Sequence, residues 1–237
     1  MTNEQAQRLA TLAKRRQSEK LPCGYSDVSR FYGGGYDDCK FVSPWTKSAH
    51  NVHNRLMIIA QDWASEDYLK KEPFNQTLAK QGFDQTFETN KCLCPLLRDY
   101  MGLDFSQTYS TNVFPFIKPG KISAPIPWRL LKKFAKDYAL PEIKIVDPLI
   151  VICLDIKTFS AIYAALPEQA DVKTKPLTWT QYKEKEPTFC SSEAIGKIEI
   201  RAVTHLGVLG KMHRREEIPG EWRSAASQRK KLRDARI

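Results

Sequence analysis

Four short segments have the composition of β-strands. They are residues 56–60, 108–113, 149–154 and 198–203. The clearest are 56–60 and 149–154, because short apolar runs rich in β-branched side chains favour buried strands over helices. Apolar and polar residues alternate in 198–203, which indicates a strand in the last position of the sheet.

Segments with apolar residues at helical spacing lie between and around these strands. They are residues 1–20, 66–81, 90–102, 127–139, 156–166 and 220–236. The first and the last of them are rich in lysine and arginine, so we expect a basic helix at each end of the chain. Residues 21–54 are predicted to be a loop, because Pro22, Pro44 and the run Gly33-Gly34-Gly35 interrupt any regular pattern.

Strands that alternate with helices are typical of a largely parallel sheet covered by helices on both faces. The sequence therefore predicts an α/β fold, a three-layer α/β/α sandwich with a central, largely parallel four-stranded sheet. Residues 1–237 contain no internal repeat, no low-complexity tract and no long linker. A single domain is the simplest interpretation.

The charge balance points to a polyanionic partner. Lysine and arginine number 37 against 27 acidic residues, which gives a net charge of +10 and an isoelectric point near 9.3. Nucleic acid is the first candidate for such a partner. No apolar run approaches the roughly 18 residues of a membrane span, and the N-terminus is not a secretory signal. The six cysteines form no dense framework, so we expect a reducing, cytoplasmic location and no membrane partner.

Polar side chains follow three of the predicted strands at the point where each strand ends. Asp62 comes directly after the first strand, Asn112 lies at the end of the second, and His205 follows the fourth. Ligand sites in open α/β sheets lie beyond the carboxyl ends of the strands. The sequence therefore predicts that an acid, an amide and an imidazole meet at one edge of the sheet. The four histidines lack metal-ligand spacing, so no metal site is expected.

Four motifs in chain order carry a family resemblance. The first is Ala60-Gln61-Asp62-Trp63-Ala64-Ser65, similar to G-Q-D-P-Y-H and followed by Pro73-Phe74, and the second is Thr111-Asn112-Val113. The third runs from Glu142 to Asp155 in the form E-I-x-x-I-x-P-x-x-I-V-x-L, with Asp155 in place of glycine. The last, His205-Leu206-Gly207-Val208-Leu209, keeps the His and Leu of H-P-S-x-L but lacks its Pro and Ser. In this order the motifs resemble the uracil-DNA glycosylase superfamily over about residues 55–215.

The resemblance implies a monofunctional DNA glycosylase that flips a pyrimidine base out of DNA, hydrolyses its N-glycosidic bond and leaves an abasic site. Asp62 then positions the hydrolytic water and Asn112 reads the base edge. Because the base leaves as an anion, its oxygen needs a hydrogen-bond donor, which His205 can supply as a neutral imidazole. Phe74 is the expected stacking platform and Leu209 the expected wedge. The remaining base-binding candidates are Gln61, Trp63 and Ala64.

Each of these residues also has a purely structural interpretation. Asp62 could cap a helix, Asn112 could be a turn residue, and His205 could be a hydrogen-bonded structural histidine. Phe74 could belong to the core, in which case Phe83 or Phe87 competes for the stacking role. Trp63 fits a pocket wall or the core equally well, and Leu209 fits a structural position as well as a wedge.

The target base depends on the position of Ala64. In one branch of the superfamily a tyrosine at that position blocks the C5 edge of the pyrimidine, whereas Ala64 leaves room for a C5 substituent. The hypothesis is a C5-modified cytosine of phage DNA, which implies antiviral defence. The close rival is uracil in base-excision repair. Two hypotheses from different functional classes also stay open: a non-catalytic binder of damaged or abasic DNA, and a nucleotide- or effector-binding protein that shares only the architecture.

Basic residues near the predicted site are candidates for contact with DNA phosphates. Lys118 and Lys121 follow the strand that carries Asn112, and Lys211, Arg214 and Arg215 follow the wedge candidate. A solvated basic face is the structural interpretation of any such cluster. We expect a monomer.

Some members of the superfamily carry an iron–sulfur cluster, and the spacing of the cysteines indicates whether this chain can hold one. Cys23 and Cys39 are too far apart for the C-x-x-C that the cluster requires, and Phe116 occupies the third cysteine position. No cluster and no other cofactor are therefore expected. Cys92 and Cys94 have no assigned role, and helix-packing thiols are the simplest account of them.

Overall fold

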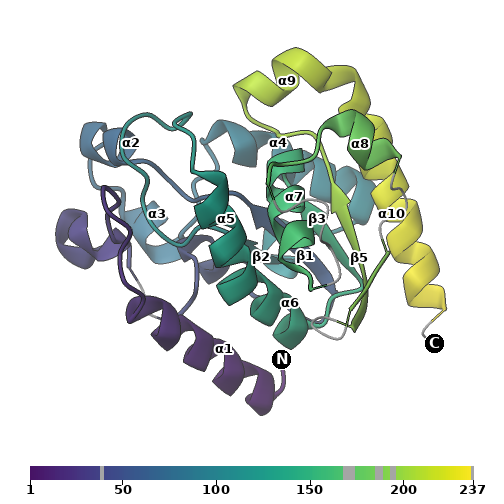
Figure 1. Cartoon of the computed structure of the whole chain (residues 1–237), viewed down its shortest axis with the longest axis horizontal. Helices are drawn as coiled ribbons and strands as arrows, with labels where there is room; N and C mark the ends of the chain where they lie inside the picture. Colours follow the sequence, from purple (N-terminus) through teal and green to yellow (C-terminus); the bar gives the residue numbers. More distant parts are fainter. Residues whose placement is uncertain (38–39, 168–173, 185–188, 193–195, 236–237) are drawn as a thin grey trace.

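The central element is a five-stranded sheet in the order β2-β1-β3-β5-β4 (Figure 1). The computed structural model describes residues 1–37, 40–167, 174–184, 189–192 and 196–235. The strands are β1 (Leu56–Ala60), β2 (Tyr109–Asn112), β3 (Ile150–Cys153), β4 (Phe189–Ser192) and β5 (Gly196–Ala202). Strands β2, β1, β3 and β5 are parallel, and β4 pairs antiparallel with β5 at the edge. The predicted α/β sandwich with four parallel strands is confirmed, and β4 is an addition that the sequence did not predict.

Both faces of the sheet are buried, which explains why its strands are nearly continuous apolar runs. In β1, Met57 and Ile59 pack into one hydrophobic cluster while Leu56 and Ile58 pack into another. All four side chains are fully buried. The alternation of a strand therefore divides the core into two halves, one on each side of the sheet.

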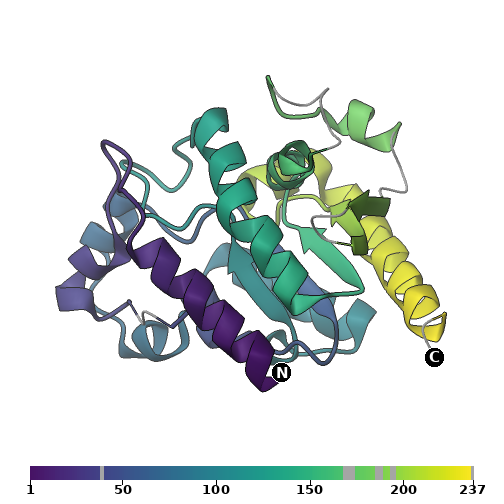
Figure 2. The same ribbon diagram turned by 60° about the horizontal axis from the view of Figure 1, so that its bottom comes forward.

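Helices form a layer on each face. One layer contains α1 (Asn3–Gln17), α5 (Trp128–Phe134), α6 (Leu140–Val146) and α7 (Ile156–Ala165), and the other contains α4 (Glu88–Leu96) and α10 (Ile218–Asp234). Figure 2 shows α1 running alongside the continuous segment formed by α5 and α6. None of the described helices combines the length and the apolar composition that crossing a bilayer requires.

Shorter elements complete the described part of the chain. They are the helices α2 (Glu66–Lys71), α3 (Gln76–Gln81), α8 (Trp179–Lys183) and α9 (Val208–Arg214), the 3-10 turns Val28–Arg30, Tyr32–Gly34, Pro44–Lys47, Phe105–Gln107 and Arg215–Glu217, and the π-helical turns Leu97–Met101 and Ala135–Ala139. Helices α2 and α9 lie at the same end of the molecule, above the sheet in Figure 1.

Several helix boundaries differ from the predicted ones for local reasons. The predicted helix 66–81 is two helices, because the backbone is extended at Glu72, just before Pro73. The side chain of Asn75 then caps α3 by accepting a 2.9 Å hydrogen bond from the Leu78 amide. The predicted helix 127–139 continues to Val146 and ends where Asp147 takes a left-handed conformation. Helices α8 and α9 were not predicted. The last helix begins at Ile218, and residue 236 lies outside the described part of the chain.

Candidate active site

A cavity of about 590 Å³ opens at the carboxyl ends of the parallel strands. Part of its polar lining comes from the segments after the four parallel strands: Gln61 and Asp62 after β1, Asn112 at the end of β2, Asp155 and Lys157 after β3, and His205 after β5. The acid, amide and imidazole predicted from the sequence therefore line one cavity. They meet because parallel strands end at the same edge of a sheet, and because the connections reverse direction between β1 and β3, where such sheets bind ligands.

Asp62 forms a buried ion pair. Its Oδ2 lies 2.8 Å from Nζ of Lys118, and the two side chains are only 9% and 4% exposed. Its Oδ1 accepts a 2.9 Å hydrogen bond from the side-chain amide of Gln61. Asp62 does not cap a helix, because Ser65 is the N-cap of α2. Both carboxylate oxygens are thus held in place at the cavity wall.

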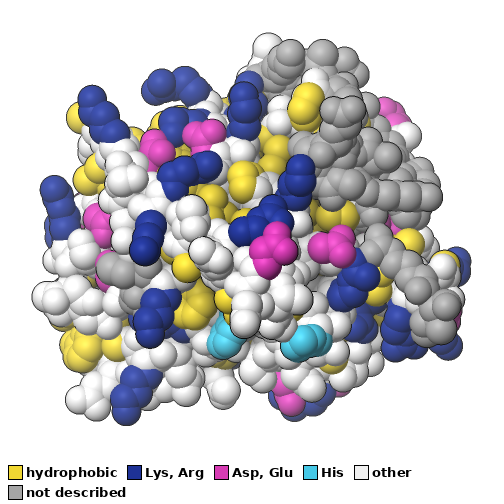
Figure 3. Space-filling model, turned by 90° about the horizontal axis from the view of Figure 1, so that it is seen from below, with side chains coloured by type: hydrophobic (Ala, Val, Ile, Leu, Met, Phe, Trp, Pro, Cys, Tyr) yellow, Lys and Arg dark blue, Asp and Glu magenta, His cyan; other side chains and the backbone are white. Residues whose placement is uncertain are grey.

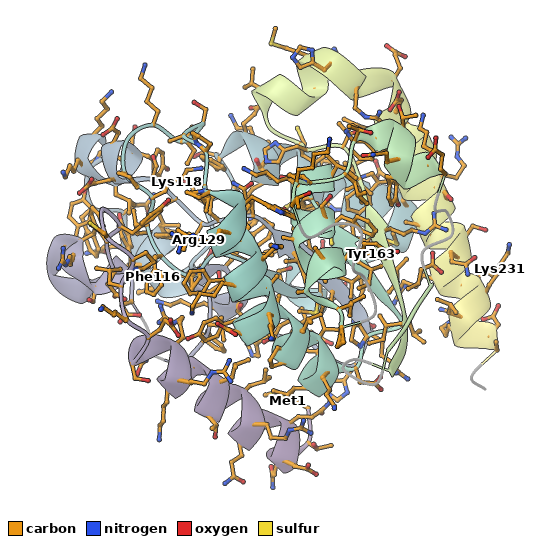
Figure 4. All side chains as sticks on the ribbon, in the orientation of Figure 1. Met1, Phe116, Lys118, Arg129, Tyr163 and Lys231 are labelled. Carbon is orange, nitrogen blue, oxygen red and sulfur yellow. The ribbon has the colours of Figure 1, made fainter. Side chains whose placement is uncertain are left out.

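The prediction that Lys118 contacts DNA phosphates is wrong. The backbone of Lys118 pairs with that of Ser65, and its carbonyl accepts the Glu66 amide at 2.9 Å. This pairing fixes the lysine beside the segment after β1 and directs its ammonium to Asp62 rather than to the surface. Figure 4 shows Lys118 in the upper part of the molecule, at the end opposite Met1.

Asn112 is the last residue of β2 rather than a turn residue, and it is only 2% exposed. The hydroxyl of Ser43 donates a hydrogen bond to its Oδ1. Ser43 is itself the N-cap of the turn Pro44–Lys47, where its Oγ accepts the Trp45 amide at 3.3 Å. Ser43 was missed in the sequence, because its motif is an ordinary Ser-Pro cap and only the fold brings it to Asn112.

His205 is an exposed residue on the otherwise buried segment that joins β5 to α9. Its Nδ1 accepts a 3.0 Å hydrogen bond from the backbone amide of Gly207. A ring nitrogen that accepts a hydrogen bond carries no proton, so the neutral ring carries its proton on Nε2. A Cβ atom at Gly210 in α9 would lie 2.0 Å from the carbonyl oxygen of His205, so the close approach of the helix to this segment requires glycine there. The hydrogen bond from Gly207 therefore favours the tautomer in which Nε2–H is the donor.

Asp155 and Lys157 add charges that were not assigned to the site in the sequence. Asp155 caps α7 with a 2.5 Å bond from the Thr158 amide, and burial raises the pKa of its carboxyl, an effect that nearby His205 opposes. Lys157 donates to the carbonyl oxygen of Ile126 at 3.1 Å. Burial lowers the pKa of the Lys157 amine, although Asp155 and Asp62 oppose the shift. The available signal was that Asp155 stands where the motif that this sequence resembles has glycine.

Aromatic side chains form one wall of the cavity. They are Trp45, Trp63, Tyr68 and Phe87. The indole N–H of Trp63 donates to the carbonyl oxygen of Gly82 at 3.1 Å, and the rings of Tyr68 and Phe87 meet edge to face at 5.8 Å. Trp63 thus belongs to the wall, as does Ala64, which is 2% exposed.

Phe74, the expected stacking platform, does not line the cavity. It is 44% exposed, and its ring packs 5.3 Å from Tyr36 and 5.5 Å from Tyr32. The prediction is wrong because the break at Pro73 turns this segment away from the sheet edge. Phe83 is buried against Phe105, with ring centroids 4.1 Å apart. Of the three phenylalanines considered, Phe87 is the one at the cavity.

The basic residues after β5 divide into two kinds. Arg214 does not have the free guanidinium that was predicted to contact DNA phosphates. Its guanidinium pairs with Glu221 at 2.8 Å and donates to Thr204 at 3.0 Å. It also lies 3.8 Å from the ring centroid of Trp179. Arg215 is exposed, as is Lys121 after β2.

Lys211 pairs with Glu88 and contacts the sulfur of Cys92 at 3.4 Å, so it ties α9 to α4. The side chain of Leu209 lies outside the described part of the structure. On the face in Figure 3, Lys and Arg are spread over the surface with acidic residues among them, so the net charge is not gathered there in one patch.

Within the described residues, no group of three or more histidine, cysteine, aspartate or glutamate side chains could hold a metal ion. Cys92 and Cys94 are free thiols on α4, and burial raises the pKa of Cys94. Cys39 lies outside the described residues.

Comparison with known proteins identifies no family: no protein-family model and no curated protein sequence matches the chain.

Proposed function

We propose that this protein is a monofunctional DNA glycosylase that receives a flipped pyrimidine in the cavity, hydrolyses its N-glycosidic bond and leaves an abasic site. One observation carries the proposal. Asp62, Asn112 and His205 come from the ends of three different strands and line the same cavity of about 590 Å³. Together they offer a carboxylate, an amide and a neutral N–H donor. Hydrolysis of this bond needs a negative group beside the sugar, recognition of the base edge, and a donor at the base oxygen.

The carboxylate of Asp62 serves the sugar side of the reaction. As the bond to the base breaks, positive charge develops on the sugar ring, and a carboxylate beside it stabilises that charge. The same carboxylate orients the attacking water. Gln61 and Lys118 hold the two oxygens of Asp62 at 2.9 Å and 2.8 Å, so the group does not need to reorganise during the reaction.

His205 serves the leaving base. Negative charge develops on a ring oxygen of the base, and Nε2–H of the neutral imidazole donates a hydrogen bond to it without transferring its proton. Removing one donor of this kind typically lowers the rate about 100- to 1,000-fold. The exposed Val208 and Met212 on α9 lie just beyond this histidine and supply apolar surface where a flipped base leaves a gap in the stack.

The cavity has room for a base larger than uracil. A pyrimidine such as uracil has eight non-hydrogen atoms, and even at the roughly 30 Å³ of a water molecule for each atom it fills less than half of the cavity. The small, buried Ala64 leaves the wall open. A C5-modified cytosine of phage DNA is therefore the proposed substrate, with an antiviral role, and uracil repair is the alternative. A cytoplasmic location and a monomeric state are part of the proposal, and the free thiols of Cys92 and Cys94 fit a reducing compartment.

The test is a base-release assay. The protein is incubated with duplex and single-stranded oligonucleotides that carry uracil, hydroxymethylcytosine or glucosylated hydroxymethylcytosine, and abasic sites are then cleaved with alkali. We expect strand cleavage with a modified cytosine, and loss of cleavage in folded Asp62→Asn and His205→Ala variants. Cleavage with uracil alone would support a role in uracil repair. Tight binding to abasic DNA without release of any base would support a non-catalytic binder, and full activity of both variants would overturn the catalytic assignment.

A further inference from the structure

The hydrogen bond from Ser43 to Asn112 determines which polar atoms the cavity presents to a base. Ser43 and Asn112 are 1% and 2% exposed, so neither side chain exchanges this partner for bulk water. The two residues are distant in sequence and meet because the turn Pro44–Lys47 packs against β2. A buried side-chain contact of this kind fixes the orientation of the amide.

The bonding capacity of the Ser43 hydroxyl sets the direction of that amide. Its oxygen accepts the Trp45 amide, which leaves its hydrogen to donate to Oδ1 of Asn112. If the amide were turned over, the hydroxyl hydrogen would lose this acceptor, and a buried donor without a partner is costly. The Nδ2 amino group of Asn112 therefore occupies the other side. The hydrogen bonds among the described residues include no acceptor for it.

We propose that Ser43 is a specificity-determining residue that fixes Asn112 as a hydrogen-bond donor, so that the cavity selects a pyrimidine with an acceptor at N3. This inference rests on the proposed glycosylase function and narrows its substrate. A cytosine ring has lone pairs at N3 and O2, which accept from Asn112. A uracil ring has a hydrogen at N3, and that donor would face the donor of Asn112. Two buried donors facing each other disfavour uracil by about tenfold or more.

The exocyclic amino group of cytosine is a donor and needs an acceptor of its own. The cavity wall contributes the carboxylates of Asp84 and Glu88 from the segment that leads into α4. These carboxylates supply acceptors to a cavity that has donors at Asn112 and His205. The oxygen at position 4 of uracil would instead face carboxylates if it entered in the same orientation.

The experiment measures binding without turnover. Two duplexes carry a single 2′-fluoro-2′-deoxycytidine or 2′-fluoro-2′-deoxyuridine, each opposite a tetrahydrofuran abasic analogue, so neither base must be unpaired before it flips. The fluorine prevents loss of the base. We expect the wild-type protein to bind the cytidine duplex at least tenfold more tightly than the uridine duplex. Equal binding, or a preference for uridine, would overturn the inference.

Variants of the serine then test its role. Ser43→Ala removes the hydroxyl and frees the amide to turn, so the preference for cytidine should fall to about twofold or less. Ser43→Thr keeps a hydroxyl and should retain the preference. Ser48→Ala is the matched control, because the Ser48 hydroxyl bonds the carbonyl of Gln81 instead.

An unchanged preference in Ser43→Ala would contradict the role of the serine. Asn112→Asp, which presents only acceptors, should reverse the preference and checks the same inference if Ser43→Ala does not fold. Failure of the proposed function is distinguishable: it would appear as no binding to either duplex beyond that to unmodified DNA, together with no base release, and the inference would fail with it.

Discussion

The backbone amide of Gly207 donates a 3.0 Å hydrogen bond to Nδ1 of His205, two residues before it in the chain. This single contact selects the tautomer of the imidazole and leaves Nε2–H as its donor. It depends on close packing, because a Cβ atom at Gly207 would lie 2.7 Å from Cε1 of the ring.

Substitution of Gly207 by alanine should therefore displace the imidazole without unfolding the protein. We expect Gly207→Ala to lower the single-turnover rate of base release about 10- to 100-fold, since small displacements of a positioned group are costly. Gly220→Ala is the control, because nothing lies within 4 Å of the added Cβ in α10. A Gly207→Ala rate within twofold of wild type would contradict the proposed role of the ring.

The Asp62–Lys118 pair should show strong coupling in stability. Lys118→Met leaves a carboxylate buried without its cation, which should cost about 3–5 kcal/mol in the free energy of unfolding. The double variant Asp62→Asn/Lys118→Met removes both charges and should be more stable than Lys118→Met alone. Urea unfolding of the wild type, the two single variants Asp62→Asn and Lys118→Met, and the double variant measures the coupling energy. Additive effects of the two substitutions would show that the pair is not formed.

Glu142 should make stability depend on pH. This buried side chain accepts a 2.8 Å hydrogen bond from the Tyr109 hydroxyl, and burial raises the pKa of its carboxyl from 4.5 to about 7. Because the folded pKa is the higher one, its contribution is fully present below pH 4.5 and is lost as pH rises to about 7. The loss amounts to about 3 kcal/mol. Urea unfolding between pH 4.5 and 8 should show this decline in the wild type and not in Glu142→Gln. Parallel plots of unfolding free energy against pH for the two proteins would contradict the role of Glu142.

Two adjacent arginines should give opposite results. Arg215 is exposed, so Arg215→Ala should weaken DNA binding and reduce the slope of log K against log salt by about 0.9, with stability unchanged. Arg214 contacts Glu221 and Trp179, so Arg214→Ala should lower stability by about 2 kcal/mol. Salt titrations of DNA binding and urea unfolding of both variants make the comparison. A reduced salt slope in Arg214→Ala alone would reverse the assignment.

Two phenylalanines provide a similar contrast for stacking. Phe87 lines the cavity, whereas Phe74 packs against Tyr32 and Tyr36 outside it. Phe87→Ala should weaken binding of a flipped base about 10-fold or more, since stacking contributes about 1–3 kcal/mol per base. Phe74→Ala should leave that affinity unchanged. Fluorescence titration with an oligonucleotide that contains 2-aminopurine beside the target position reports the difference, and a larger effect of Phe74→Ala would show that Phe74 is the stacking residue.

The path of the loops explains why some candidate residues lie where the sequence predicted and others do not. Asp62, Asn112 and His205 were found because each lies at the end of a strand, and parallel strands bring their ends together. Lys118 and Phe74 were misplaced because each lies on a segment whose direction depends on contacts with distant residues. Pairing with Ser65 turns Lys118 inward, and the break at Pro73 turns Phe74 outward.

The sequence by itself determined the class of the fold, because the local spacing of apolar residues indicates whether a segment is a strand or a helix and which of its faces is buried. It also placed Asp62, Asn112 and His205 at the sheet edge, although it did not indicate Asp155 and Lys157 beside them. The tertiary structure alone decided how those side chains are held: the Lys118 ammonium against Asp62, and the Ser43 hydroxyl against Asn112. These contacts join residues far apart in the chain, and their geometry depends on how the intervening loops pack rather than on any local pattern.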